Sequence, residues 1–575
     1  MAHAIIELNG TYTETGPFAR GLGAAEPGPH VRLDRILEQV DRIVRKSRIK
    51  TVVIHRSEKF SAPSLGALEG IRLALMQLRQ AERHLVYYAA GYTFDDLYLS
   101  SVCTTRIIHR LGTVSFLGRA ISRLYFARLL SRHGISVDVI RHGKYKSAMT
   151  PFTEESIDSF DREQLEHILN LMVDRVRTIV GTEVIPSGTA LDSLLSGRVV
   201  DAQSAVEKGW IERIDDLQGI KDSLKEEKSR PAKRRRAKGR IGNSGPNVAL
   251  YFFDGAIDHG TNRRSPLLGR VVGSDWYVEQ LKKVRDDKST QALVLRVNSP
   301  GGSASASEDI RREILRIREK KPVIVSMGPV AASGGYWIST SASRIFAHKF
   351  TVTGSIGVIT GLFLLRDFLA RRGITASVLR SGDHADLGSA LREMTAEERR
   401  IFEEQIDRIY DEFVQIVSTS REMDAEAVRE VSGGRVWTGE DAMERGLVDE
   451  LGDIRAALDY TADALGVSSV QVRFGPVVRR PLVERLLAGR MPSTVDPLAL
   501  MRHLGDREPE DHSAAEGATS GTNGMLFAPA LVGVARECLH LSGRPLALWT
   551  GGITPYYSTA TDPEGSSKTS SERMR

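Results

Sequence analysis

The stretch ALVLRVNSPGGSASASEDIRREILRIREKKPVIVSM (residues 292–327) has, in order, the patterns of a strand, a turn, a helix and a strand. ALVLRV is apolar and rich in β-branched residues except for one arginine, which is typical of a buried strand, and NSPGGS has turn composition. The next segment is amphipathic, with Ser307 as its expected N-cap and Ile310, Ile314 and Ile317 on one face. PVIVSM is the second strand. Two strands joined by a helix through short turns predict a mostly parallel sheet with right-handed crossovers, and therefore an α/β fold.

The chain also repeats itself. GGRVWTGEDAMERGLVDELGD (433–453) matches SGRVVDAQSAVEKGWIERIDD (196–216), and three shorter pairs match in the same order, at offsets that drift from 237 to 245 residues. These pairs are YWISTSASRI with YLSSVCTTRI, LVLRVNSPG with VVIHRSEKF, and LYFFDG with IIELNG. We therefore expect two homologous repeats, with a linker between them and an extension after them. The predicted boundaries are 1–222 and 246–470 for the repeats, 223–245 for the basic linker and 471–575 for a partly disordered C-terminal extension.

Composition narrows the class of protein. The chain has 575 residues, 41% of them hydrophobic and 26% charged, which is ordinary for a globular protein of two or more domains. The net charge of +6 is small, and the basic linker is interpreted as a solvated tether, so no nucleic-acid partner is expected. Cys103 and Cys538 lie far apart, which excludes a disulfide framework and a cysteine-based zinc site. No metal and no cofactor are expected.

Targeting signals are not visible in the sequence. The start, MAHAIIELNGTYTETG, has neither a basic region nor a long apolar core, as a signal peptide would have. The late apolar run MLFAPALVGVA (525–535) is about half the length that a spanning helix needs, and it contains Pro529. Taken as written, the chain is expected in the cytoplasm.

Two glycine-bearing loops follow strands of the second repeat, where parallel sheets place their ligand sites. NSPGG contains Gly301 and Gly302, and AASGG contains Ser333 followed by Gly334. Amides from the two loops could converge on one oxygen, as an oxyanion hole for acyl transfer requires, with Ser333 as the nucleophile. The alternative is a serine that caps a helix, with glycines that permit close packing.

Comparison of the repeats shows where the base for such a serine would lie. An offset of 238 residues places Asp95 at the position of Ser333, so the first repeat lacks the nucleophile. RHGKYKSA in the first repeat corresponds to RSGDHADL in the second, which places Ala385 opposite Lys146. The half with the serine lacks the lysine and the half with the lysine lacks the serine. One composite site built from both repeats explains this division.

The motifs VNSPGGSASASE, AASGGYWIST, TGSIG and GKYKSAMTPF resemble those of the signal peptide peptidase A (SppA) family, in its long two-repeat form. The resemblance covers most of residues 1–470 and implies two tandem ClpP/crotonase-like repeats and a serine endopeptidase that forms an acyl-enzyme. It implies Ser333 as the nucleophile, Lys146 as the general base, an oxyanion amide from the NSPGG loop, and Ser355 near the lysine. Its implied substrates are peptides such as remnant signal peptides, and its implied assembly is a homotetramer. Family members commonly begin with a membrane anchor, which this sequence does not show, so peripheral membrane contact stays open.

Several alternatives stay open at this point. Lys144 lies two residues from Lys146, and on an extended segment both would point the same way. His142 and His384 flank the same loops, and Ser355 could be a structural turn residue. Crotonase-type chemistry on acyl-CoA thioesters would use the oxyanion hole without Ser333. A non-catalytic scaffold would use none of these residues.

Overall fold

The computed structural model describes residues 2–16, 29–226, 245–265, 268–476 and 546–547 of the chain. Most of the expected linker and nearly all of the expected C-terminal extension lie outside the described residues, so the predicted domain boundaries stay predictions. Within the described part, no helix is both long enough and apolar enough to cross a membrane.

The first repeat is built on a parallel sheet in the order β1-β4-β5-β6-β10. Its strands are rich in β-branched and aromatic residues; β4, for example, is IKTVVIHR and is buried over most of its length. The strands are β1 (Ala2–Leu8), β4 (Ile49–Arg56), β5 (His84–Ala89), β6 (Thr105–Ile108) and β10 (Arg213–Ile214). The flanking helices are α1 (Leu33–Arg45), α2 (Leu65–Gln80), α3 (Phe94–Ser100), α6 (Ser159–Glu183), α7 (Gly188–Leu195), α8 (Ala202–Glu207) and α9 (Leu217–Glu226). Two small ribbons pair β2 (Thr11–Thr13) with β3 (His30–Arg32) and β7 (Thr113–Ser115) with β9 (Val199–Asp201).

The second repeat has a larger sheet in the order β21-β19-β17-β15-β11-β23, with β18 beside β17 and β22 beside β18. It is parallel except where β21 meets β19. Its strands are β11 (Asn247–Asp254), β15 (Thr290–Ser299), β17 (Val323–Ala332), β18 (Arg344–Ala347), β19 (Val352–Gly354), β21 (Val436–Thr438), β22 (Glu450–Leu451) and β23 (Gln471–Gly475). Its helices are α10 (Ser274–Asp286), α11 (Ala304–Arg318), α12 (Gly334–Ser339), α13 (Arg366–Ala370), α14 (Ala396–Arg421), α15 (Ala425–Glu430), α16 (Gly439–Glu444) and α17 (Ile454–Ala464).

The stretch that predicted the fold forms β15, α11 and β17, and β15 pairs in parallel with β17 as expected. One local detail was wrong. Ser303, not Ser307, caps α11, because its Oγ accepts the Ala306 N–H at 3.3 Å. The helix therefore begins directly after the NSPGG turn, and Ser307 lies one turn inside it, where its Oγ donates to the Ser303 carbonyl at 2.8 Å.

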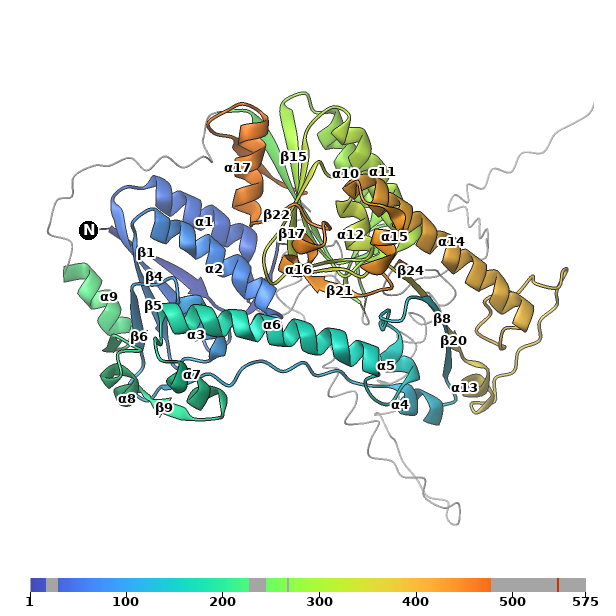
Figure 1. Ribbon diagram of the computed structural model, residues 1–575, viewed down its shortest axis with the longest axis horizontal. Helices are drawn as coiled ribbons and strands as arrows, with labels where there is room; N and C mark the ends of the chain where they lie inside the picture. The colour runs from blue at the N-terminus through green and yellow to red at the C-terminus, as the bar shows by residue number, and fades with distance from the viewer. Residues whose placement is uncertain (1, 17–28, 227–244, 266–267, 477–545, 548–575) are drawn as a thin grey trace, which may run out of the picture.

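A third sheet joins the repeats, in the order β13-β14-β12-β16-β24-β20-β8. Its last strand, β8 (Ser136–His142), belongs to the first repeat and pairs antiparallel with β20 (Val358–Leu364) of the second. Figure 1 shows β8 beside β20, far from the sheet of the first repeat, with the long α6 running back along the molecule. The arm around β8 therefore carries RHGKYKSA into the second repeat. The other strands are β12 (Ala256–Asp258), β13 (Arg263–Ser265), β14 (Gly269–Gly273), β16 (Gly302–Ser303) and β24 (Leu546–Ala547), and the arm's short helices are α4 (Ala127–Arg132) and α5 (Thr150–Thr153).

The two repeats also share a core. One cluster of buried side chains contains residues of both, including Tyr98 of α3 against Phe350, and α2 packs on β17. Inside this interface Arg296 of β15 is 1% exposed and forms an ion pair with Glu14 of the first repeat at 3.1 Å. The expected class, an α/β protein of two tandem repeats with mostly parallel sheets, is confirmed.

Candidate active site

Ser333 lies at the sharp turn between β17 and α12. Its φ of 52° and ψ of −112° are unusual for a residue with a side chain, and small residues surround it in AASGG. The backbone holds this conformation at both ends, because the Ser333 N–H donates to the Gly354 carbonyl at 2.7 Å and its own carbonyl accepts the Trp337 N–H at 2.6 Å. Ser333 is fully buried in the single chain. The local fold thus presents the Oγ at a fixed point.

Lys146 reaches that point from the first repeat. Its Nζ lies 2.8 Å from Ser333 Oγ, 2.7 Å from the Ser355 carbonyl oxygen and 3.1 Å from Ser355 Oγ. The residue is 1% exposed, and burial lowers the pKa of the Lys146 amine well below its ordinary value. Desolvation causes that shift, and among the described residues no neighbouring carboxylate stabilises the charged amine. The structure therefore brings Ser333, Lys146 and Ser355 into direct contact.

The turn that carries Lys146 is seated on a glycine loop of the second repeat. The Tyr145 N–H donates to the Gly433 carbonyl at 3.0 Å, and Gly143 is close enough to Gly433 that a Cβ would lie 2.4 Å from its backbone. A Cβ on Gly434 would lie 2.7 Å from the Cβ and backbone nitrogen of Lys146. Only glycine at 434 leaves room for Lys146 where it stands.

A polar cluster fixes the same turn from the side. The Tyr145 hydroxyl donates to the Glu163 carboxylate at 3.1 Å, and Arg435 reaches both the hydroxyl, at 3.1 Å, and the carboxylate, at 2.9 Å. Gln164 of α6 donates to the Tyr145 carbonyl and accepts the Val436 N–H. These contacts tie α6 of the first repeat to β21 of the second. They hold the lysine in register with the serine.

Sequence reasoning did not identify this supporting loop. GGRVW (433–437) served only as evidence of the duplication, and its role depends on a contact between segments almost 290 residues apart. A signal was present, however, because the matching position of the first repeat has Ser196 in place of Gly433. Gly433, which lies against Gly143 and Tyr145, is thus a glycine that the first repeat lacks, whereas Gly434, which lies against Lys146, corresponds to Gly197.

The rival side chains lie elsewhere. Lys144 is exposed, and its Nζ lies over the rings of Tyr145 and Phe160, 5.2 Å and 5.1 Å from their centroids. His142 Nδ1 lies 2.6 Å from Asp407, and the ring stacks on Tyr410. His384 lies 3.5 Å from the Glu398 carboxylate. The contacts of these three side chains do not include Ser333.

The two glycine loops meet beside Ser333. A Cβ on Gly334 would lie 3.0 Å from the Gly302 nitrogen and 2.7 Å from Ser307 Oγ, so Gly334 and Gly302 are in close contact. Gly301 is oriented differently: its N–H donates to Ser299 Oγ at 3.1 Å and its carbonyl accepts the Ile257 N–H at 2.8 Å. Gly301 and Gly302 both have positive φ, 99° and 153°, which this turn requires.

The corresponding place in the first repeat has a structural role. Asp95 forms an ion pair with Arg119 at 2.7 Å, and burial raises the pKa of its carboxyl. Asp96 caps α3 through Thr93 and accepts the Tyr87 hydroxyl at 2.9 Å. At the positions of Ser333 and Gly334, the first repeat therefore has two acidic residues, Asp95 and Asp96, whose carboxylates make structural contacts.

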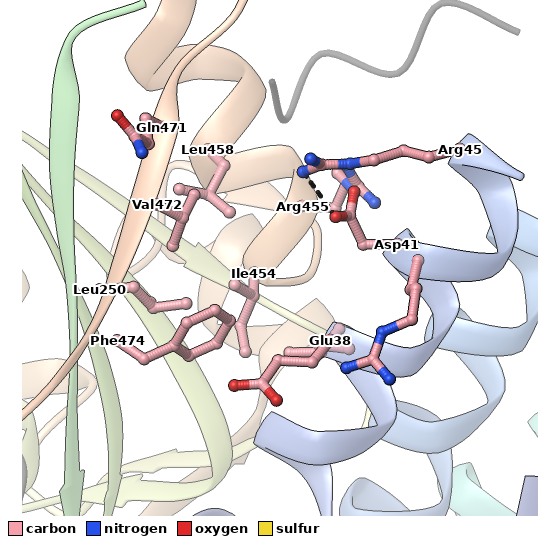
Figure 2. Close-up of a pocket in the computed structure, with 12 residues that line it drawn as sticks. Glu38, Asp41, Arg45, Leu250, Ile454, Arg455, Leu458, Gln471, Val472 and Phe474 are labelled. Carbon is pink, nitrogen blue, oxygen red and sulfur yellow. Dashed lines mark ion pairs between the residues drawn. The ribbon is translucent and has the colours of Figure 1, made fainter. Parts of the chain in front are cut away.

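Other features of the surface do not coincide with this site. A cleft of about 330 Å³ lies between α1 of the first repeat and α17 and β23 of the second (Figure 2). Its lining contains none of the predicted site residues, and its charges are partly paired, as with Arg45 and Asp41 at 2.6 Å. In the described part of the chain, no group of three or more His, Cys, Asp or Glu side chains is arranged to hold a metal ion.

Comparison with known proteins places this geometry in a family. The model of peptidase family S49 matches residues 77–230 and 316–468. The chain is 30% identical to Protease 4 from Salmonella typhi over 80% of this chain and 77% of that protein. It is also 30% identical to Protease 4 from Haemophilus influenzae over 70% of this chain and 68% of that protein. A putative signal peptide peptidase SppA from Enterococcus faecium is 39% identical over 32% of this chain and 54% of that protein.

Among solved structures, a ClpP1 mutant from Listeria monocytogenes matches 37% of this chain and 94% of that one, at 17% identity and a TM-score of 0.24. The family model matches more than half of this chain, and each Protease 4 is covered over more than two thirds of its length. The chain therefore belongs to peptidase family S49 and is a serine-type peptidase.

Proposed function

We propose that the protein is an endopeptidase in which Ser333 and Lys146 form a catalytic dyad across the two repeats. The 2.8 Å contact between Lys146 Nζ and Ser333 Oγ carries this proposal. A lysine can take a proton from serine only when it is neutral, and complete burial without a carboxylate partner favours the neutral amine. Lys144 is exposed and is not the base.

The contacts of Lys146 match the needs of a neutral amine, which has two N–H groups and one lone pair. The carbonyl and hydroxyl of Ser355 accept the two N–H groups, and the lone pair then faces the Ser333 hydroxyl. Ser355 is therefore a positioning residue for the base. The Ser355 φ of 53° and the bond from its N–H to the Arg435 carbonyl at 2.7 Å hold it in place.

The proposed reaction is an acyl transfer in two steps. Lys146 accepts the hydroxyl proton as Ser333 Oγ bonds to the peptide carbonyl carbon, and the resulting ammonium gives that proton to the leaving amine as the C–N bond breaks. The product is an acyl-enzyme on Ser333. A water molecule, deprotonated by the neutral Lys146, releases the acid and restores the hydroxyl.

The amides of Gly302 and Gly334 are proposed as the oxyanion hole. The close contact of these glycines places donors from both loops on one side of Ser333. Gly301, the third residue expected there, has its N–H engaged by Ser299 and is proposed only to shape the turn. The conformation of Gly301, with positive φ, lets the next amide turn toward the site.

The proposed substrates are short or unfolded peptides, with remnant signal peptides as the class that the SppA relative's name indicates. Backbone pairing supports an extended substrate. The two-residue strand β24 of the chain itself lies antiparallel to β16, where Gly302 pairs with Ala547, and also pairs with β20. A peptide in that place would run past the NSPGG loop as an added strand. We also propose that the protein forms a homotetramer and makes peripheral contact with a membrane.

Turnover of casein and of a short peptide ester tests the dyad. Ser333→Ala is expected to reduce kcat/KM by about 10⁴-fold or more, and Lys146→Ala by about 10² to 10⁴-fold. Lys144→Ala is the matched control, because it removes an exposed amine from the same turn, and it is expected to keep wild-type turnover. Unchanged turnover in Ser333→Ala or Lys146→Ala refutes the dyad.

A further inference from the structure

The chain contains two copies of an arm in which a short helix joins two segments, and within the described residues one segment of each copy pairs as a strand. In the first repeat the arm consists of residues 119–125, α4 and β8; in the second it consists of β20, α13 and residues 375–381. Within the chain β8 pairs with β20. Residues 119–125 and 375–381 form neither helix nor strand, although they correspond to these two strands.

An offset of 239 residues aligns the two arms without a gap. It aligns RHGISVDVIRHG (132–143) with RRGITASVLRSG (371–382). The backbone agrees with this alignment, because α4 begins at Ala127 and α13 at Arg366, positions that match under the same offset. The glycines that follow the two helices, Gly134 and Gly373, have nearly the same φ, 75° and 72°. The two arms therefore have the same local design.

The unpaired segments expose the side chains that their counterparts bury. In the β8–β20 pair, Ile140 lies opposite Thr360, and they are 5% and 4% exposed. The residue equivalent to Ile140 is Leu379, which is 99% exposed, and the residue equivalent to Thr360 is Ile121, which is 49% exposed. A single exposed apolar side chain is ordinary, but several of them on two equivalent segments indicate a contact surface. Further exposed apolar side chains on the two segments or beside them are Leu117, Leu124, Ile374 and Val378.

We propose that residues 375–381 of one copy pair antiparallel with residues 119–125 of a second copy. This contact between two chains would repeat the contact that β8 and β20 make within a single chain. The register of β8 on β20 then places Ile121 opposite Leu379 and Leu124 opposite Ala376. A second copy is the occupant because the free segment of each arm corresponds to a strand that already has this partner. Both segments offer unpaired backbone and apolar side chains of matching length.

The charges beside these segments do not oppose the contact. Arg119 is paired with Asp95, Arg123 with Asp161, and Arg380 lies 3.4 Å from Asp386. The contact is head-to-tail, since different surfaces of the two copies meet. Such contacts close into a ring or continue as a filament. This inference specifies the joint of the proposed homotetramer and does not rest on the Ser–Lys chemistry.

Disulfide trapping tests the register. The double variant Ile121→Cys with Leu379→Cys is oxidised and run on a non-reducing gel, where we expect a ladder of covalently joined chains that ends at four and collapses on reduction. Opposed residues of an antiparallel pair lie about 4.5–5.5 Å apart between Cα atoms, within disulfide reach. Leu124→Cys with Ala376→Cys is the second in-register pair and is expected to give the same ladder.

Matched control variants distinguish cross-linking in the proposed register from cross-linking by random collision of the chains. Ile121→Cys with Ala376→Cys is three positions out of register, about 10 Å along the strand, and is expected to cross-link at least tenfold less. All variants are made in a Cys538→Ser background, which removes the second native cysteine. Each single variant is then expected to give no ladder, because Cys103 is buried and its thiol pKa is raised to about 12. A disulfide that forms within one chain, or a ladder equally strong in the out-of-register variant, overturns the proposal.

A second variant tests the surface without cysteines. Leu379→Asp alters a side chain that is 99% exposed in the single chain, so its fold is expected to stay intact. Light scattering should show that the wild type is an oligomer and that Leu379→Asp is dissociated. A monomeric wild type, or an undisturbed oligomer in the variant, overturns the inference. Peptide turnover is measured separately, so failure of this contact and failure of the dyad are distinguishable.

Discussion

Burial of the Lys146 side chain determines what its amine can do. In water the amine would be charged at neutral pH and would have no lone pair to offer. In the folded chain, desolvation lowers the Lys146 pKa, and the contacts to Ser333 and Ser355 use hydrogen-bonding groups that a neutral amine can satisfy. The chemistry therefore depends on one side chain that the fold keeps away from both water and acids.

The pH dependence of turnover follows from that burial. We expect kcat/KM for a peptide ester to rise with pH through one ionisation, as Lys146 loses its proton, with a midpoint well below the value of about 10.4 for a free lysine. Initial rates across pH 5 to 10 measure it. Lys144→Met should leave the midpoint unchanged. A midpoint near 10.4, or one that moves in Lys144→Met, would refute Lys146 as the base.

The same burial makes Lys146 costly for stability. Below the lowered pKa both the folded and the unfolded states bind the proton, so the full cost of a buried charge is present. As the pH rises through that pKa only the unfolded state keeps its proton, and the cost shrinks until about pH 10.4, where it vanishes. Lys146→Met should therefore raise the melting temperature most at low pH and progressively less toward pH 10.

Calorimetry of Lys146→Met and the wild type at several pH values measures this difference. Ser333→Ala is the control, because it removes the neighbouring hydroxyl but keeps the lysine. The difference in melting temperature between Ser333→Ala and the wild type should vary little with pH. A melting-temperature gain in Lys146→Met that is constant, or that grows with pH, contradicts a buried amine with a lowered pKa.

At the scale of elements, the glycine loop under Lys146 offers a matched pair of substitutions. Gly433 and Gly434 both have positive φ, so alanine at either place should cost about 1–2 kcal/mol of folding free energy. Only at Gly434 would the new Cβ meet Lys146, whereas at Gly433 it meets nothing within 4 Å. We expect Gly434→Ala to lose most peptide turnover and Gly433→Ala to keep it. Equal activity losses in the two variants would refute a positioning role for the loop.

The elements differ in how far the sequence predicts them. The strand–turn–helix–strand around NSPGG was predictable because local hydrophobic periodicity and glycine turns determine it. The cap of α11 was placed one turn late, because Ser303 and Ser307 have the same capping chemistry and the preceding turn decides between them. The loop 433–437 was missed because its function depends on a contact with Lys146 from the other repeat.

At the scale of the whole molecule, the docking of the two repeats holds the proposed dyad together. Glu14 and Arg296 form a buried ion pair across that interface, and Arg296 lies on the strand that leads into the NSPGG loop. Glu14→Ala leaves a buried guanidinium without its carboxylate, which should cost about 3–5 kcal/mol. Glu38→Ala removes a more exposed pair with Arg35 and should cost about 1 kcal/mol or less. Thermal unfolding of both variants tests this, and similar melting temperatures would contradict the role given to the buried pair.

The division of the proposed site between the repeats was predictable from the chain alone, because Asp95 and Ala385 stand where the missing serine and lysine would be. The path of the arm was not. Antiparallel pairing of β8 with β20 depends on how the repeats dock, and the pattern of β8 (SVDVIRH) differs too little from that of residues 375–381 (TASVLRS) to reveal which of the two is paired. Assembly of the repeats, more than the pattern of either one, places Lys146 beside Ser333.

The rate at which a serine-directed phosphonate modifies Ser333 tests the cross-repeat pair most directly, because it reports the nucleophile and its base without any assumption about substrate. Mass spectrometry of the labelled peptide locates the adduct, and stopped samples give its rate at neutral pH. We predict a single adduct on Ser333, a rate about 10² to 10⁴-fold lower in Lys146→Met, and a wild-type rate in Lys144→Met. An adduct on another residue, or an unchanged rate in Lys146→Met, would contradict the account.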